Sequence, residues 1–401
     1  MPNDLFITNV RPMGSGTVNI AITDGAISAV GPDATAPEAG TPAVEGGEAL
    51  VFPGFIDAHT HIDKTLLGMP WRRHEVGPTL MDKIVNEREL VKRLDLDSHE
   101  RSMEQVRRSL ANGTTAIRTF SDINTEWKLK GFHGLLKTRE DVGGLMDLQI
   151  VTFPQSGMLI RPGTLALMDA AMAEGADVVG GIDPCSVDRD PAGHLDAIFA
   201  LADKHDADID IHLHEPGELG AFSLDLVIER TRVMGWRGRV VISHALCLGG
   251  VDDMRLRGLA EQLVELDIAI MTHAPGGHRA IPDVKLLRSL GVRVCSGNDG
   301  VRDAWGPLNK PDMLQRAYIM AYRNNLRRDD DIEELIRIVT TGSAEVIGLP
   351  KHGIEAGARA DLVLVDAETH VEAVIEHPPR KAVIKGGRVV ARDGALLDGI
   401  L

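Results

Sequence analysis

The segment Phe52-Pro-Gly-Phe-Ile-Asp-Ala-His-Thr-His61 is a short apolar run that ends in two histidines separated by one residue. Its apolar residues predict a buried strand, and residues i and i+2 of a strand point to the same face. His59 and His61 therefore project together from the end of this strand. Two imidazoles in that arrangement form a metal-binding pair by geometry, so this segment indicates both a fold and a site.

Seven further apolar runs follow this segment, and amphipathic stretches such as 98–112, 162–174, 192–205 and 222–234 lie between most of them. Strands that alternate with helices predict βαβ units and a parallel sheet. Eight such units over about 250 residues match a (β/α)8 TIM barrel in the α/β class. The predicted strands are 54–61, 114–120, 148–154, 177–182, 207–214, 240–244, 268–273 and 292–297.

The two ends of the chain differ from this middle, because both consist of short β-rich segments divided by Gly and Asp. We expect the ends to meet in one small β-sandwich domain, with residues 32–47 as a surface loop. The predicted organisation is a barrel over 54–347 and a β-sandwich built from 1–53 and 348–401. The predicted end strands are 5–10, 16–20, 26–30, 360–365, 382–385 and 388–390.

Composition excludes several classes of partner. The chain has 401 residues with 43 Lys and Arg against 59 Asp and Glu, a net charge of −16, which argues against nucleic acid and anionic membranes. Three widely spaced cysteines form neither a disulfide framework nor a CxxC zinc site. No apolar run is long enough to span a membrane, and the start lacks the basic region of a signal peptide. We therefore expect a cytoplasmic protein.

The candidate functional residues are expected at the strand ends, since active sites of TIM barrels lie at the carboxyl ends of the strands. Besides His59 and His61, His212 lies near the end of strand five, His244 ends strand six and Asp299 follows strand eight. A single histidine at such a place is most often solvated or hydrogen-bonded. Several on neighbouring strand ends, together with a carboxylate, predict a site for Zn²⁺ or Fe²⁺.

The segment 52–61 resembles the first-strand signature of the amidohydrolase superfamily, and Gly357-Ala-Arg-Ala-Asp-Leu-Val-Leu-Val-Asp366 resembles the return of that family into its β domain. The resemblance runs nearly end to end. Within the superfamily the chain is most similar to the bacterial cytosine deaminase branch. The segments that carry this likeness are 147–155, 175–181, 212–215, 243–244 and 299–308.

The resemblance implies a role for individual residues of this chain. The implied ligands of a single divalent ion, zinc or iron, are His59, His61, His212 and Asp299. The implied proton-transfer residues are Glu215 and His244. Asp299 is counted as catalytic as well, because its carboxylate can accept the proton of the attacking water as the attack proceeds. The implied substrate-binding residues are Gln155, for a ring amide edge, and Trp305, as an aromatic wall. A small heterocycle is the expected substrate, and a homo-oligomer is the habit of the family.

Two positions depart from the cytosine deaminase pattern. Gly300 stands where that branch has a second Asp, and Phe120 stands where the family often has a His. Both positions are expected near the substrate. Loss of the carboxylate at Gly300 should remove a charge and open a cavity beside the ring, which favours a ring system larger than cytosine. We therefore count Gly300 among the substrate-binding residues.

The expected reaction is hydrolytic deamination of an aminated nitrogen heterocycle that is cytosine-like, isoguanine-like or pterin-like. A metal lowers the pKa of its bound water from near 16 to roughly 7, and the resulting hydroxide can attack the ring carbon and release ammonia. Glu215 lies just past strand five, where a turn at Pro216-Gly217 can bring it over the pocket to protonate a ring nitrogen. His214 and His273 are expected in the pocket wall or in structural roles, and Lys64 can pair with an acid.

Alternatives remain at this stage. A triazine hydrolase that removes an N-alkyl amine uses the same metal ligands and stays open. A two-metal hydrolase of cyclic amides needs a bridging Lys at the end of strand four, and residues 178–184 contain none. The other zinc deaminase fold needs P-C-x-x-C, which the chain lacks. A non-enzymatic protein of this fold typically loses metal ligands, whereas all of them are present here.

Overall fold

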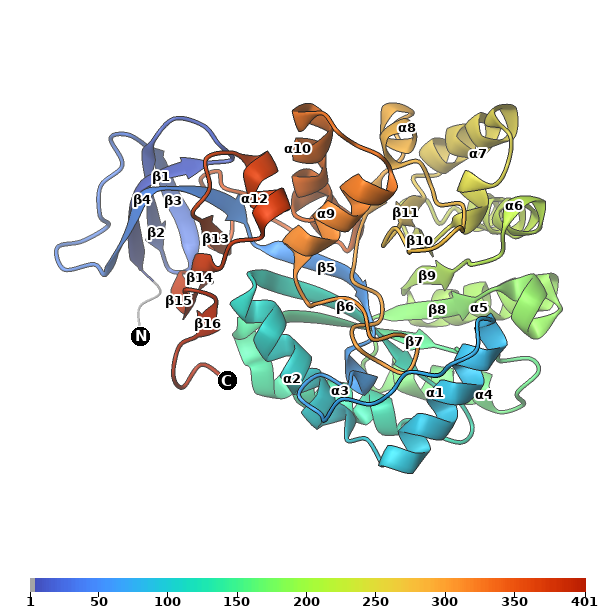
Figure 1. The fold of residues 1–401 in the computed structure, drawn as a ribbon. Coiled ribbons are helices and arrows are strands. Elements are labelled where there is room, and N and C mark those ends of the chain that lie inside the picture. The colour runs from blue at the N-terminus through green and yellow to red at the C-terminus, as the bar shows by residue number, and fades with distance from the viewer. Residues whose placement is uncertain (1–3) are drawn as a thin grey trace.

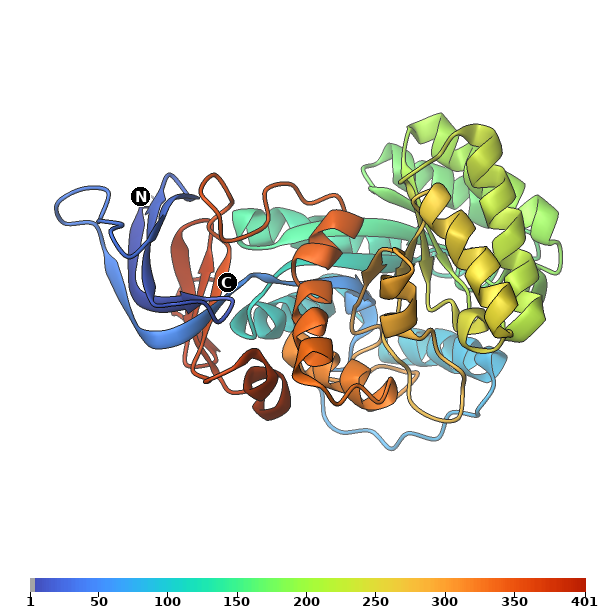
Figure 2. The ribbon, with the colours of Figure 1, turned by 90° about the horizontal axis from the view of Figure 1, so that it is seen from above.

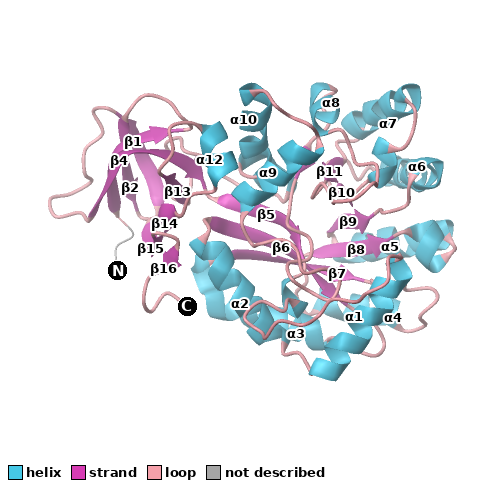
Figure 3. Cartoon of the chain, in the orientation of Figure 1, coloured by secondary structure: helices cyan, strands magenta, loops and turns pink. Residues whose placement is uncertain are grey.

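The structure, a computed structural model, describes residues 4–401, so the first three residues of the predicted 1–53 segment lie outside the described part. Its centre is an eight-stranded parallel sheet in which the strands follow one another in chain order from β5 to β12, with helices around the outside (Figures 1 and 3). All eight strands predicted from the apolar runs are present, so the predicted TIM barrel is confirmed. The strands are β5 (Phe55–Thr60), β6 (Thr114–Asp122), β7 (Asp147–Phe153), β8 (Val178–Ile182), β9 (Asp208–His212), β10 (Val240–Ser243), β11 (Ala269–Met271) and β12 (Val294–Cys295).

The barrel closes where its first strand meets the segment after its last strand. The backbone N–H of Ala58 donates to the carbonyl of Ser296 over 3.0 Å, and that of Asp299 donates to the carbonyl of His59 over 2.8 Å. Thr60 and Asp299 also form a parallel bridge. These bonds satisfy backbone groups that two open edges would expose, and they place Asp299 beside the His59–His61 pair.

The helices pack on the barrel through a continuous apolar core, and the predicted helical stretches correspond to α2, α4, α5 and α6. Among the described helices, none combines the length and the apolarity needed to cross a membrane. The helices are α1 (Leu80–Leu94), α2 (Ser98–Ala111), α3 (Lys130–Val142), α4 (Thr164–Ala173), α5 (Pro191–His205), α6 (Gly217–Met234), α7 (Asp253–Glu265), α8 (Val284–Ser289), α9 (Met313–Arg323), α10 (Asp329–Ile338), α11 (Thr341–Val346) and α12 (His370–Glu376).

Helix α1 stands outside the regular alternation, because it precedes α2 between strands β5 and β6. Thr79 and Asp82 form a capping box, in which each side chain accepts from the backbone N–H of the other over 3.1 and 3.0 Å. Asn86 donates from Nδ2 to the carbonyl of Ala304 over 2.8 Å. That bond ties α1 to the loop after β12, so the helix becomes part of the wall around the site.

The chain ends form one continuous sheet of eight strands in the order β16-β15-β14-β13-β4-β1-β2-β3. Its halves come from opposite ends of the chain, as the blue and red strands of Figures 1 and 2 show, and they join where β4 pairs antiparallel with β13. Fully buried residues of both halves share one core. The strands are β1 (Leu5–Pro12), β2 (Val18–Thr23), β3 (Ala26–Gly31), β4 (Ala43–Pro53), β13 (Leu362–Val365), β14 (Arg380–Lys385), β15 (Arg388–Arg392) and β16 (Ala395–Leu396).

The predicted loop over 32–47 is wrong at its far end, because β4 already begins at Ala43. Its first residues pair in parallel with β1. A Cβ on Gly46 would lie 2.1 Å from Cγ1 of Val10, so glycine is needed there for the two strands to approach. The glycines that suggested a loop instead serve close packing within the sheet.

Candidate active site

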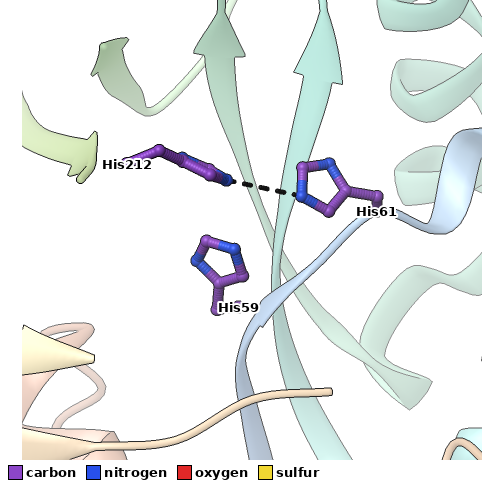
Figure 4. A group of neighbouring side chains, drawn as sticks. All are labelled: His59, His61 and His212. Carbon is purple, nitrogen blue, oxygen red and sulfur yellow. Dashed lines mark hydrogen bonds between the residues drawn. The ribbon is translucent and has the colours of Figure 1, made fainter. Parts of the chain in front are cut away.

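Three imidazoles and one carboxylate converge at the carboxyl end of the barrel. Nε2 of His61 lies 3.5 Å from Nε2 of His212 and 3.3 Å from Oδ1 of Asp299. Nε2 of His59 lies 3.8 Å from the same oxygen. Figure 4 shows His59 and His61 at the end of one strand, with His212 reaching toward them from the other side. The structure thus brings together all four residues that the resemblance implied as metal ligands.

The geometry of these side chains fits a bound divalent ion. Ligand atoms about 2.1 Å from a tetrahedral zinc lie about 3.4 Å from one another, close to the separations seen here. Nε2 of His59 and Nε2 of His244 are buried and have no hydrogen-bond partner among residues 4–401. A buried polar atom without a partner is costly, and a metal or a water on it would remove that cost.

The protonation states also suit metal binding. Burial lowers the pKa of His61, and it lowers the pKa of His59 and His212 well below the usual value, so these rings are neutral near pH 7. Burial alone would raise the pKa of Asp299, but His273 and His61 hold it well below its usual range. Three neutral imidazoles beside a carboxylate are the states that a metal requires.

A chain of hydrogen bonds orients His59. Ser243 donates from Oγ to Oδ1 of Asp210 over 2.6 Å, and Arg118 donates to the other oxygen of Asp210 over 3.2 Å. The contact of 2.9 Å between Nδ1 of His59 and the Ser243 hydroxyl must therefore be donated by the imidazole. His59 then carries its proton on Nδ1 and presents the lone pair of Nε2 to the cluster.

Two phenylalanines enclose the imidazoles. The ring of Phe153 stacks on His212 with centroids 4.1 Å apart. The ring of Phe120 lies 4.2 Å from His59 and edge-on to His212 at 4.6 Å. At the position where the family often has a His, Phe120 therefore packs against two of the implied ligands and adds no further polar group. This apolar contact helps to hold both imidazoles in place.

A cavity of about 40 Å³ adjoins the cluster. The predicted substrate residues Gln155, Gly300 and Trp305 all line it, and so does His214. His214 bonds to Asp183 over 2.7 Å and stacks on His244 with centroids 4.2 Å apart, so it acts as a wall. The other lining residues are His61, Glu87, Phe153, Ile182, His212, Asp299 and Asp303.

Glu87 and Lys64 form a buried network with Gln155. Lys64 donates to Oε1 of Glu87 over 2.7 Å and to Oε1 of Gln155 over 3.3 Å, and Gln155 donates from Nε2 to Glu87. The expected pairing of Lys64 with an acid is present. Sequence reasoning missed Glu87 because it lies on α1, away from the strand ends. Its place in the helical stripe with Ile84 and Val91 was the available signal.

The expected cavity at Gly300 is absent. A Cβ built on Gly300 would lie 2.0 Å from Oδ2 of Asp303, so the carboxyl group of Asp303 fills that space. Its Oδ1 accepts from the backbone N–H groups of Trp305 and Gly306 over 2.8 and 3.2 Å. Burial and the nearby Glu87 carboxylate raise the pKa of Asp303 to about 7. The carboxylate that seemed to be lost is supplied by a residue three positions later.

Glu215 does not line the cavity. It is buried just past β9, and its carboxylate accepts from the backbone N–H of Ser186 over 2.7 Å and from Oγ of Ser223 over 2.5 Å. The expected swing over the pocket is therefore not seen in this conformation, because both carboxylate oxygens are already bound. The carboxylate instead anchors the turn Pro184–Asp188 to helix α6.

His244 and His273 lie against the four implied metal ligands. Nδ1 of His244 is 3.1 Å from Nδ1 of His273, whose Nε2 is 3.4 Å from Oδ2 of Asp299. Burial lowers the pKa of His244 well below its usual value and that of His273 to about 4. His273, whose role the sequence left open, links His244 to Asp299.

Comparison with known proteins agrees with the fold and this geometry. The sequence model of the amidohydrolase family matches residues 103–391, so the chain belongs to that family. It is an enzyme, a hydrolase that acts on carbon–nitrogen bonds, and the predicted resemblance is confirmed.

Three known proteins show to which members of the family this chain is similar. The crystal structure of N-isopropylammelide isopropylaminohydrolase from Burkholderia multivorans shares 44% identity and a TM-score of 0.95 over 98% of this chain and 100% of that one. N-isopropylammelide isopropyl amidohydrolase of Pseudomonas sp. (strain ADP) is 30% identical over 87% of both chains. The 5-methylcytosine deaminase from Klebsiella pneumoniae, liganded with 5-fluorocytosine, is 26% identical with a TM-score of 0.86 over 96% of this chain and 97% of that one.

Proposed function

We propose that this enzyme hydrolyses the bond between a ring carbon and an exocyclic amine, and that N-alkylamino hydroxytriazines of the N-isopropylammelide type are its preferred class. Water supplies the oxygen that replaces the amine on the ring. The alkylamine leaves with a proton from that water. The reaction thus consumes one water and yields a hydroxytriazine and a free amine.

The observation that carries the proposal is the position of the metal cluster directly beside a cavity with an amide and an indole in its wall. Gln155 faces that cavity, and Trp305 lies on the loop after β12. The 44% identity to an N-isopropylammelide hydrolase over nearly the whole chain supports a triazine over the cytosine-like, isoguanine-like or pterin-like rings expected from the sequence.

One divalent ion, zinc or iron, would be held by His59, His61, His212 and Asp299. The ligand atoms of His59, His61 and His212 lie within 4.8 Å of one another, and so do those of His59, His244 and Asp299, so His244 is also within reach of the ion. Bound there, such an ion would supply Lewis-acid activation of the attacking water. Both metals accept imidazole and carboxylate ligands, so the donor set suits either. The rest of the mechanism belongs to side chains of this chain.

Asp299 and His244 would handle the proton of the attacking water. Asp299 is a carboxylate at neutral pH and can accept that proton. Nε2 of His244 is buried without a partner among the described residues and can hydrogen-bond the oxygen as it attacks. Gln155 still has one N–H and one lone pair beyond its bonds to Glu87 and Lys64, which suits a ring amide.

Glu215 would carry a proton to the leaving amine in this proposal. For that step its carboxylate must exchange the Ser223 hydroxyl for the substrate. His214, the residue before Glu215, already lines the cavity. The movement required is therefore that of a side chain next to the wall of the site.

Deamination of a monocyclic aminopyrimidine is the second candidate. The specific observation in its favour is that a carboxyl group does stand beside Gly300, because Asp303 provides it. A small aminopyrimidine would then keep a polar partner in the cavity. The 26% identity to 5-methylcytosine deaminase agrees with this reading.

The deciding experiment is a comparison of leaving groups on one ring. Protein loaded with zinc or with iron is given N-isopropylammelide and the same triazine with an unsubstituted amine, alongside 5-methylcytosine and a pterin. Release of isopropylamine or ammonia is measured and kcat/KM compared. We expect N-isopropylammelide to rank first. A tenfold preference for a pyrimidine or a pterin would overturn the triazine assignment.

A further inference from the structure

Gly300 and Asp303 share a single place in the wall of the active-site cavity. Both line it, and any Cβ at position 300 would overlap Oδ2 of Asp303 at 2.0 Å. Gly300 follows Asp299, so this place is next to the metal cluster along the chain. The absence of a side chain at Gly300 is therefore the condition that lets the carboxyl group of Asp303 reach the cavity.

The two oxygens of Asp303 are used differently. Oδ1 accepts from the backbone N–H groups of Trp305 and Gly306, and the backbone N–H of Asp303 donates to the carbonyl of Gly306 over 3.1 Å. These bonds hold the carboxyl group in a tight loop. Oδ2 accepts no hydrogen bond, and the carboxylate makes no ion pair, with any residue in the described range 4–401.

The free oxygen is open to a hydrogen-bond donor. Asp303 is only 5% exposed as a residue, but its Oδ2 keeps an accessible surface, and Asp303 lines the cavity. Glu87 and Asp299 lie in the same wall and offer no proton donor while ionised. The open side of Oδ2 is the cavity itself, so at a pH above about 7, where Asp303 is ionised, a molecule bound there can supply an N–H group.

We propose that Asp303 is the specificity-determining residue of this enzyme, and that its Oδ2 accepts a hydrogen bond from a ring N–H of the substrate. The inference rests on the proposed function, since it requires a heterocycle with a ring amide in this cavity. Hydroxytriazines in their keto form carry such ring N–H groups. Gly300 then acts as a positioning residue, because it leaves the space that Asp303 occupies.

The loop that carries Asp303 also carries Trp305, so one loop provides both the hydrogen-bond acceptor and the aromatic wall for a substrate ring. Oδ1 of Asp303 accepts from the backbone of Trp305, whose indole lines the cavity. Lys83 of α1 lies over that indole at 5.6 Å, which keeps helix and loop together. A substrate ring would therefore meet the carboxyl group and the aromatic wall as parts of one rigid loop.

Asp303→Asn tests the contact without breaking the loop. An Asn side chain keeps an oxygen for the N–H groups of Trp305 and Gly306, but it replaces the free acceptor with an NH₂ donor. We expect kcat/KM of the zinc-loaded enzyme for N-isopropylammelide to fall about 10- to 100-fold, mostly through KM. Tm and bound zinc should stay at the parent values. Asp252→Asn is the matched control, because Asp252 caps α7 in the same way at a distance from the cavity.

A ring-methylated substrate separates recognition from structure. With the ring N–H replaced by N-methyl, the parent loses the contact, so parent and Asp303→Asn should differ by less than about threefold. A loop that was merely damaged would lower the rate on both substrates alike. An Asp303→Asn enzyme within threefold of the parent on N-isopropylammelide would overturn the proposal and leave Asp303 as a loop cap.

Gly300→Ala tests whether a Cβ at position 300 and the carboxyl group of Asp303 compete for the same space. The backbone of Gly300 lies outside the left-handed region, so alanine adds little strain of its own. Its Cβ must displace the carboxyl group, and we expect a loss similar to that of Asp303→Ala. The double variant should have the same kcat/KM as Asp303→Ala alone, because the carboxyl group with which the new Cβ would clash is already missing. Additive losses would mean that Gly300 acts independently of Asp303.

Failure of the proposed function gives a different result. If the parent hydrolyses none of the rings, binding of the trihydroxytriazine product to the zinc-loaded protein is measured by calorimetry. A tenfold weaker Kd for Asp303→Asn would support the contact even then. Equal Kd values, or no binding to the parent, would overturn it.

Discussion

Nε2 of His61 and Nε2 of His212 face each other at 3.5 Å, although one follows the first barrel strand and the other ends the fifth (Figure 4). Two neutral nitrogens at this distance gain little from one another. The two nitrogens would both be stabilised by a cation between them, and Oδ1 of Asp299 lies 3.3 Å from the same Nε2 atom of His61. His61, His212 and Asp299 are therefore arranged as side chains around one shared ion would be.

Removal of any one ligand should empty the metal site. We expect His61→Ala and His212→Ala to retain almost no zinc after desalting and to lose measurable turnover, because each variant removes one of the side chains that would hold the ion. Elemental analysis and amine release are the measurements. His278→Ala, at an exposed position, is the control. A full metal complement with activity in either variant would refute the ligand assignment.

Metal affinity should resist mild acid. Burial lowers the pKa of His59, His61 and His212 below the usual value, so protons compete with the metal only at a pH below that of ordinary histidines. We expect the zinc Kd, measured by chelator competition, to change little between pH 7.5 and 6. Three imidazoles with ordinary pKa values would release zinc increasingly as the pH falls through about 6.5. A steep loss in this window would contradict the burial argument.

Glu215→Gln distinguishes proton transfer from structural support. If the carboxylate turns toward the substrate, kcat should fall by roughly 10²–10⁴-fold while metal content is unchanged. Glutamine can still accept from Ser186 and Ser223, so the turn should persist. Glu218→Gln, three residues later and exposed, is the control. Activity within a few-fold of the parent would show that another group moves the proton.

The buried pair of Lys64 and Glu87 should matter for stability. Both side chains are almost fully buried, and Lys64→Met would leave the Glu87 carboxylate without its cation. Removing one partner of a buried ion pair costs about 3–5 kcal/mol, so the midpoint of urea unfolding should move to a clearly lower urea concentration. The double variant Lys64→Met with Glu87→Met should recover part of that loss. Arg73→Ala, which breaks the exposed pair with Glu75, should cost at most about 1 kcal/mol.

Much of the fold and of the metal cluster could be predicted from the sequence. Strands that are buried on both faces form short, mostly apolar runs, and helices show their own period, so all eight barrel strands were predictable from local pattern. The carboxyl ends of parallel strands meet at one edge of the barrel. His59, His61, His212 and Asp299 therefore had to be neighbours once the barrel was inferred.

Residues in the wall of the cavity were harder to predict. Glu87 lies on a helix outside the strand–helix alternation, and only the packing of α1 over the barrel mouth brings it to Gln155. Glu215 has a strong motif context, yet its side chain direction depends on Ser186 and Ser223, which belong to other segments. A motif indicates the type of residue but leaves its rotamer undetermined.

Position 300 shows most clearly what the sequence determines and what depends on the tertiary structure. The sequence by itself determined the barrel and its strand ends, because these follow from periodicities of a few residues and from the parallel order of the strands. The candidate metal ligands followed from the strand ends together with the resemblance to known amidohydrolases. The sequence also showed that Gly300 lacks a carboxylate. Only the tertiary structure decided that Asp303 folds back into the vacated place at 2.0 Å from a would-be Cβ. Loop backbones and side-chain directions depend on which atoms compete for the same volume, and that competition exists only once distant segments are packed together.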